Sequence, residues 1–477
     1  MWEKIDKILL GFKEAFKRKA AYRWFVTLVV GMLIRSDKLG ITSVIRDMML
    51  RSEDYDSMLH FFRAKSWDIS EVRKCWYKVI ATQETLYKET NRAVLVGDGT
   101  KQYKEGRYMP GVKKMKQESE TQSKAEYIYG HLWGTVGVLI GTAETLACIP
   151  LSSRIHDGLQ AMKEWKDSTV SGLSHVVEMI RNVCEAAQYL GDCLCLLDRY
   201  FLSVPALLEL MAQNKRNQHK VDIITRAKRS IVGYQEPVRE PGKRGRKPKK
   251  GTKVKIGELF QEKEKEFVEE TMTLYGETKT VSFYCIDLLW GKTLYQKLRF
   301  VLVKCGETQG ILVSTDTTLD PRTIIQLYCC RFKIECTFRV LKHQLGGFSY
   351  HFWTKAIDKL RHFRKDSDPD PLEKAQSDHD KIRVQLTVRA TEMYALISNV
   401  ALGILQILSI DSFLSGQLPH LRYQRTAPRN RPSEDSLMCF LRSHIFTSML
   451  CNPNYQIPRL IFSAQNRVRK LISRKVS

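Results

Sequence analysis

Short apolar runs that end at an acidic residue constrain the fold of this chain more than any other feature. Ala93-Val94-Leu95-Val96 leads into Gly97-Asp98-Gly99, and Cys193-Leu194-Cys195-Leu196-Leu197 leads directly into Asp198. Short runs of apolar and β-branched residues that are bounded by turn residues are typical of buried strands. The sequence therefore predicts two buried strands, each of which ends at a carboxylate.

Further elements can be placed around these two strands. Strands are predicted at residues 126–133, 135–148 and 221–226, and helices at residues 170–189 and 204–211. The chain order is then strand, strand, strand, helix, strand, helix, strand, with an acid closing the first and the fourth strand. This order resembles that of a ribonuclease H-like core, a fold of the α/β class.

The predicted core is interrupted and later resumed. Residues 90–229 and 319–412 are assigned to the core, and a helix at residues 321–342 resumes it. Between them, residues 230–318 are predicted to form a β-rich insertion with strands at residues 280–290 and 298–304 and a basic linker. Residues 413–477 form a helical C-terminal region, which is assigned to oligomerisation or DNA contact.

Residues 1–85 are predicted to form a helical, basic N-terminal domain. Leu39 to Ile45 contains a turn followed by a helix start, which suggests a unit of the helix-turn-helix kind that binds DNA. A helical packing domain without DNA contact is the alternative. Nothing in this segment identifies side chains that read bases.

The charge balance favours a polyanionic partner. Lysine and arginine number 77 against 52 acidic residues, which gives a net charge of +25. Nucleic acid and anionic membranes are the partners that attract such a surplus, and a basic protein without either remains the alternative. The apolar stretch Trp24 to Ile34 is too short to cross a bilayer, and residues 395–410 carry polar residues at helical intervals, as a buried core helix does. We therefore expect DNA rather than a membrane as partner.

Two further observations concern the compartment. Met1 to Lys19 mixes Glu, Asp and Lys, which is unlike a signal peptide. The twelve cysteines are scattered without a C-x-x-C pair, which is typical of neither a zinc site nor a disulfide framework. The sequence predicts a cytoplasmic protein with reduced cysteines.

The helix predicted at residues 321–342 carries four functional candidates: Tyr328, Arg331, Glu335 and Lys342. At roughly 100° per residue all four project within about 60° of one another. A carboxylate among cations suits a site that holds a metal ion and a phosphodiester together, whereas a solvated charged face is the alternative.

Three acids in the order strand, strand, helix meet the needs of two-metal phosphoryl transfer. Asp98, Asp198 and Glu335 would converge on two Mg²⁺ or Mn²⁺ ions roughly 4 Å apart. An isolated acid after a strand is often a turn or cap residue. Asp192 is the rival of Asp198, but Asp192 opens its strand, whereas Asp98 closes its own. Asp198 is therefore preferred.

The chain resembles the DDE transposases of bacterial insertion sequences, in particular insertion sequence family four. The resemblance covers roughly residues 90–410 and rests on the three acids, the Y-R-E-K face and two motifs. The first motif is Gly97-Asp98-Gly99-Thr100 with Gly106 to Val112, and the second is Leu197-Asp198-Arg199-Tyr200-Phe201. The 137 residues from Asp198 to Glu335 leave room for the β-rich insertion that this family places before its catalytic helix.

The resemblance implies cut-and-paste transposition. A nick frees a 3′-hydroxyl, which attacks the opposite strand to form a hairpin, and the reopened end is joined to target DNA. Asp98, Asp198 and Glu335 would be the catalytic residues and metal ligands, and the partners would be terminal inverted repeats and target DNA, bound by a homodimer. A catalytically silent DNA-binding protein and a host nuclease of the same fold are the alternatives.

The resemblance also implies residues that contact DNA. Tyr328, Arg331 and Lys342 would hold the terminal phosphates and a flipped base, on which Trp290 would stack. A core tryptophan is the alternative identity of Trp290. The basic linker from Lys243 to Lys255 has eight cations and loosely resembles an arm that enters the minor groove, or it is a solvated loop with general phosphate affinity. Its DNA-binding candidates are Lys243, Arg244, Arg246, Lys247, Lys249 and Lys250.

Overall fold

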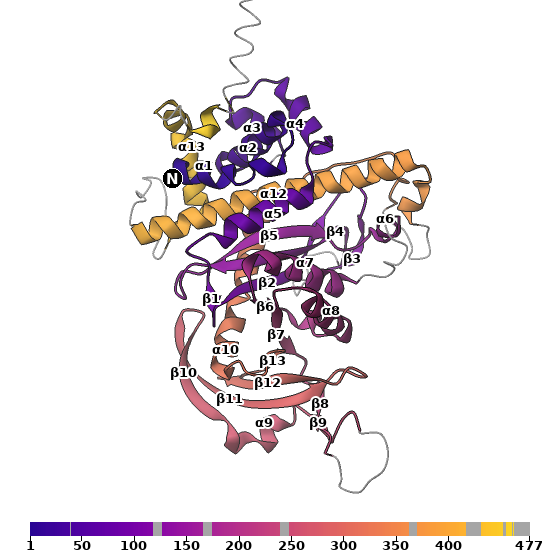
Figure 1. The fold of residues 1–477 in the computed structure, drawn as a ribbon, viewed down its shortest axis with the longest axis vertical. Helices are drawn as coiled ribbons and strands as arrows, with labels where there is room; N and C mark the ends of the chain where they lie inside the picture. Colours follow the sequence, from indigo (N-terminus) through magenta and orange to yellow (C-terminus); the bar gives the residue numbers. More distant parts are fainter. Residues whose placement is uncertain are drawn as a thin grey trace, which may run out of the picture.

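A computed structural model describes residues 1–38, 40–117, 126–165, 174–238, 248–361, 370–415, 431–451, 455–459 and 461. Over these ranges the chain is a mixed α/β protein built around one large sheet of thirteen strands (Figure 1). In chain order the strands are β1 (Lys88–Glu89), β2 (Arg92–Tyr103), β3 (Lys113–Lys116), β4 (Tyr127–Ile140), β5 (Ala147–Ile155), β6 (Cys193–Leu197), β7 (Val221–Ala227), β8 (Val232–Tyr234), β9 (Lys253–Lys255), β10 (Val268–Leu274), β11 (Glu277–Trp290), β12 (Gln296–Cys305) and β13 (Thr308–Ser314).

The order across the sheet is β3-β4-β2-β6-β7-β13-β12-β11-β8-β9, with β1 on β2, β5 on β4 and β10 on β11. Its centre is parallel, because β6 pairs in parallel with both β2 and β7. Parallel neighbours need crossover connections, and α7 (His175–Leu190) and α8 (Val204–Arg216) lie in these connections. The mixed α/β class agrees with the prediction, and the large mixed sheet is consistent with a ribonuclease H-like core.

The observed order of core elements, β2, β4, β5, α7, β6, α8 and β7, agrees with the prediction, with short additions at β1, β3 and α6 (Gln160–Glu164). Residues 170–173 of the helix predicted at residues 170–189 lie outside the described residues. Two predicted boundaries are wrong. β2 continues beyond Asp98, because residues 98–103 pair antiparallel with β4. The strands predicted at residues 126–133 and 135–148 both fall mainly on β4, and β5 shares only residues 147 and 148 with the second of them. Gly134 does not break β4, and the chain turns at Gly141, whose φ of +103° favours glycine.

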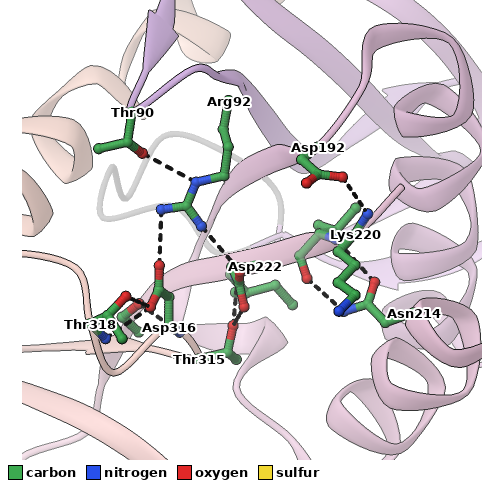
Figure 2. Close-up of polar contacts among 12 residues, drawn as sticks. Thr90, Arg92, Asp192, Asn214, Lys220, Asp222, Thr315, Asp316 and Thr318 are labelled. Carbon is green, nitrogen blue, oxygen red and sulfur yellow. Dashed lines mark hydrogen bonds and ion pairs between the residues drawn. The ribbon is translucent and has the colours of Figure 1, made fainter. Parts of the chain in front are cut away.

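Polar contacts join the strands at the end of the sheet where β2, β6 and β7 begin (Figure 2). Arg92 forms ion pairs with Asp222 on β7, at 3.2 Å, and with Asp316 after β13, at 2.9 Å. Asp192 accepts a hydrogen bond from the backbone N–H of Lys220 at 2.9 Å. Asp192 therefore helps to fix this end of the sheet, whereas Asp198 follows the other end of β6.

The second half of the sheet is antiparallel and joins the first half through β7 and β13. The strands predicted at residues 280–290 and 298–304 are confirmed as β11 and β12. A second apolar cluster covers this half and includes Leu207 of α8, Phe300 of β12 and Phe260 of α9 (Leu259–Glu262).

The N-terminal segment is helical, as predicted, and its role in DNA binding stays a prediction. Its helices are α1 (Trp2–Leu10), α2 (Lys19–Ile34), α3 (Thr42–Asp47), α4 (Asp54–Arg63) and α5 (Ile69–Ala81). They share one apolar core with the sheet and with α12 (Asp378–Ser415). In Figure 1 the long helix α12 crosses the molecule between the N-terminal helices and the sheet. Among the described C-terminal residues, α13 (Glu434–Cys451) packs against α2 and α12.

Helix α12 explains the apolar stretch at residues 395–410. Among the described residues, one helix, Asp378–Asp411, has the length and the hydropathy that a membrane span requires. The most apolar part of this helix is completely buried inside the protein. The prediction of a buried core helix at residues 395–410 is therefore confirmed.

Candidate active site

Strand register places Asp98 beside Asp198. Gly97 of β2 pairs in parallel with Leu197 of β6, so that Asp98 and Asp198 follow at neighbouring positions. Gly97 faces α7, since a Cβ built on it would lie 2.7 Å from Leu197 Cδ2 and 3.0 Å from Met179 Sδ. Successive side chains of extended chain alternate between faces, and Asp198 is extended. Both carboxylates therefore point to the face opposite α7.

The helix predicted at residues 321–342 supplies the third acid, but the prediction of a single helix is wrong. The structure has α10 (Pro321–Cys330) and α11 (Lys333–His343), which meet at Arg331 and Phe332. The junction tightens because Arg331, Ile334 and Glu335 each donate their backbone N–H to the residue three positions earlier. Tyr328 therefore lies on a different helix from Glu335 and Lys342, and the single-helix angles do not describe the four residues.

Arg331 joins the acid of the sheet to the acid of the helix. Its Nη1 donates to Asp98 Oδ2 at 2.9 Å and lies 3.7 Å from Glu335 Oε1. The other oxygen of Asp98 accepts the N–H of Gly99 at 2.7 Å. The guanidinium thus stands between two of the three predicted carboxylates.

The pKa of Asp98 reflects its burial first and the neighbouring charges second. Burial raises the pKa of Asp98 to about 7, the charge of Arg331 opposes this rise, and the charges of Glu335 and Asp198 add to it. Burial also raises the pKa of Tyr328, which Arg331 lowers and Asp198 raises. The structure therefore brings five predicted residues into one electrostatic environment: Asp98, Asp198, Glu335, Tyr328 and Arg331.

The remaining candidates lie elsewhere. Lys342 Nζ donates to the carbonyl oxygen of Lys101 at 2.9 Å, which directs it to β2 three residues after Asp98. Trp290 ends β11, is partly buried and packs against the second apolar cluster. This position agrees with the alternative identity of Trp290 as a core tryptophan. The stacking of Trp290 on a flipped base stays a prediction.

The basic linker is described only in part. Lys243, Arg244, Arg246 and Lys247 lie outside the described residues. Lys249 is exposed, and Lys250 Nζ lies over the rings of Tyr234 and Tyr295, at 4.3 and 5.5 Å from their centroids. Such cation–π contacts at an exposed position are worth about 0.5–1 kcal/mol each.

Exposed aromatic side chains near the acids were missed as functional candidates. Tyr200 follows Asp198 in the short helix η2 (Arg199–Phe201) and is 65% exposed, and Phe332 beside Arg331 is 58% exposed. Tyr275, between β10 and β11, is 68% exposed and lies close to Cys329 and Tyr328 of α10. The motif around Asp198 could have identified Tyr200, whereas the exposure of Phe332 and Tyr275 has no sequence signal.

The chemistry of the donor set fits a divalent cation. Carboxylate oxygens are the ligands that Mg²⁺ and Mn²⁺ prefer, and a buried carboxylate among other acids gains most from a nearby cation. Within the described ranges, no three His, Cys, Asp or Glu side chains already converge as a metal-binding group. In this arrangement the guanidinium of Arg331 supplies the positive charge between Asp98 and Glu335.

Comparison with known proteins identifies a family. The family described as DDE superfamily endonuclease matches residues 11–283, which is more than half of the chain. The matched range contains Asp98 and Asp198 and ends before Glu335. No curated protein and no solved structure matches the chain. The chain therefore belongs to the DDE superfamily of endonucleases, a family that implies a metal-dependent nuclease with a DNA substrate.

Proposed function

We propose that this chain is a DNA transposase that moves an insertion sequence by cut-and-paste transposition. Asp98, Asp198 and Glu335 are its catalytic carboxylates and the ligands of two Mg²⁺ or Mn²⁺ ions. The strand register that sets Asp98 beside Asp198, opposite the helix with Glu335, carries the proposal. The family match over residues 11–283 supports it.

Each residue has a distinct part in the proposed reaction. Strands β2 and β6 hold Asp98 and Asp198 rigidly, and α11 brings Glu335 from the other side. Divalent cations, when bound, lower the pKa of the attacking hydroxyl and stabilise the leaving oxygen. Arg331 pairs with a non-bridging phosphate oxygen once DNA enters, and Tyr328 orients the same phosphate. Nicking, hairpin formation and joining are each an in-line attack on a phosphodiester, so that one site serves all three steps.

The proposed partners follow from this reaction. The enzyme binds the terminal inverted repeats of its element and then target DNA, and it does so as a homodimer in a bacterial cytoplasm, at the nucleoid. The net charge of +25 supports a polyanionic partner.

The test is metal-dependent cleavage of the DNA ends that flank the gene. Asp98→Asn, Asp198→Asn and Glu335→Gln should each abolish cleavage and leave end binding nearly intact, because each removes a ligand but no surface cation. Asp192→Asn is the matched control, since Asp192 binds a backbone N–H at the opposite end of β6. A triad variant that cleaves like the wild type would remove its residue from the site.

The same assay separates the alternatives. A chain that binds the ends without metal-dependent cleavage is a silent DNA-binding protein. A chain that cleaves but never joins 3′ ends to a new target is a host nuclease. Either outcome would contradict the proposal.

A further inference from the structure

Two facing glycines leave space behind Asp98. Gly99 of β2 pairs with Gly134 of β4. A Cβ on Gly99 would lie 2.8 Å from Nε2 of His175, and a Cβ on Gly134 would lie 1.9 Å from Cε1 of His156. Two imidazole rings therefore fill the space that two side chains would otherwise take, on the face of the sheet opposite the carboxylate of Asp98.

The two rings form a hydrogen-bonded chain. Nδ1 of His156 lies 2.7 Å from Nδ1 of His175, and Nδ2 of Asn182 lies 2.8 Å from Nε2 of His156. Because the amide Nδ2 can only donate, Nε2 of His156 accepts, and its Nδ1 carries the proton. That Nδ1 then donates to Nδ1 of His175, which leaves the proton of His175 on Nε2.

Burial keeps both rings neutral. It lowers the pKa of His175 to about 4 and lowers the pKa of His156 well below its usual value. A neutral, hydrogen-bonded pair can stand side by side at neutral pH without charge repulsion. Asn182 and His156 thus set the orientation of His175.

His175 also touches the segment that follows Asp198. Its ring centroid lies 5.3 Å from that of Phe201 and 6.0 Å from that of Tyr200. One ring therefore packs against the residue after Asp98 and against the short helix after Asp198. The ring of His175 therefore contacts both acid-bearing segments on the face of the sheet opposite the carboxylate of Asp98.

We propose that His175 is a positioning residue for the acidic pair: its ring, oriented by His156 and Asn182, holds β2 at Asp98 in fixed relation to the turn after Asp198. This inference rests on the proposed function. Residues that hydrogen-bond metal ligands typically change metal affinity or activity about 10–100-fold when they are removed, and His175, which acts through packing, should reach the lower end of this range.

The experiment uses the full chain and Mn²⁺ alone, with binding measured by calorimetry. His175→Ala and Gly99→Ala should each weaken Mn²⁺ binding about tenfold or more. Cleavage by both variants should show a lower kcat with an unchanged KM for DNA, because the DNA surface is intact. The double variant should bind Mn²⁺ better than Gly99→Ala, because the new methyl group can occupy the space that the ring has left.

The control separates positioning from stability. Val183, about two turns further along α7, is also buried. Val183→Ala should lower the Tm and leave Mn²⁺ affinity unchanged. Mn²⁺ binding by His175→Ala that equals the wild type, or a double variant as weak as the product of the two single effects, would overturn the inference. A wild-type chain that neither binds Mn²⁺ nor cleaves DNA would overturn the proposed function and the inference with it.

Discussion

At the scale of single residues, Arg331 links two of the three predicted carboxylates. Its guanidinium is the cation that contacts both Asp98 and Glu335, at 2.9 and 3.7 Å. Arg331→Ala should reduce kcat for strand transfer about 10²-fold, as the loss of one preorganised donor to a reacting oxygen does. Lys333→Ala is the control, because Lys333 is a neighbouring cation on α11. Lys342→Ala should reduce kcat by an intermediate amount, since Lys342 contacts the backbone of Lys101. A larger loss for Lys333→Ala than for Arg331→Ala would contradict this assignment.

Lys104 allows a prediction about pH. It is 2% exposed and donates to the backbone oxygens of Phe348 and Tyr350, and burial lowers its pKa to about 7. In the unfolded chain the amine titrates near 10.4, so that from about pH 7 to 10 the unfolded chain binds a proton that the folded chain lacks. The free energy of unfolding should therefore rise with pH in this window, by up to about 1.4 kcal/mol per pH unit.

The measurement compares wild type with Lys104→Met by urea unfolding at several pH values. Titrations of other groups cancel in the difference between the two proteins. The wild type should gain stability relative to Lys104→Met as the pH rises from 7 to 10. A difference that is independent of pH would show that Lys104 stays protonated in the folded state.

At the scale of elements, sequence patterns predicted strands and helices where apolar residues determine them. The runs before Asp98 and Asp198 are apolar because strands at the centre of a covered sheet are buried. The second half of β2 is largely polar, and its strand structure comes from backbone pairing with β4, which no local pattern shows. The junction between α10 and α11 contains neither Gly nor Pro, the residues that usually break or bend a helix, so no local pattern predicts the division.

Two short segments allow the roles of Tyr200 and Trp290 to be separated. Tyr200→Ala on η2 should leave the Tm nearly unchanged and slow cleavage, because an exposed ring beside Asp198 can stack on a base, worth about 1–3 kcal/mol. Trp290→Ala at the end of β11 should lower the unfolding free energy by less than the roughly 3–5 kcal/mol of a fully buried tryptophan, since the partly buried ring packs against the second cluster. Thermal melts and single-turnover cleavage of both variants check this. Slower cleavage by Trp290→Ala with an unchanged Tm would return Trp290 to the site.

At the scale of the whole molecule, the site depends on contacts that join distant parts of the chain. Asp98 and Arg331 are 233 residues apart in the sequence. Residue types and their order in the chain predicted Asp98 and Arg331 as site residues. The register of β2 on β6 and the ion pair between these two residues, however, depend on the packing of the complete sheet against α11. The N-terminal helices and α12 belong to the same apolar core as the sheet. The change in composition near residue 90 suggested a separate N-terminal domain and did not show this shared core.

Net charge is the other property of the whole molecule, and the linker from Lys243 to Lys255 concentrates eight of the 77 cations. If the linker contacts phosphates, replacing these eight by Gln or Ser should lower the affinity for all DNA sequences alike. The slope of log K against log salt concentration should become shallower by about 0.9 for each lost phosphate contact. Cleavage of a saturating, preassembled end should survive, because Asp98, Asp198 and Glu335 lie on other elements.

If the linker instead enters a groove, the cognate end should lose more affinity than random DNA, with a smaller change in the salt slope. We expect the uniform loss, and an unchanged affinity together with an unchanged slope would contradict both roles and leave the linker as a spacer.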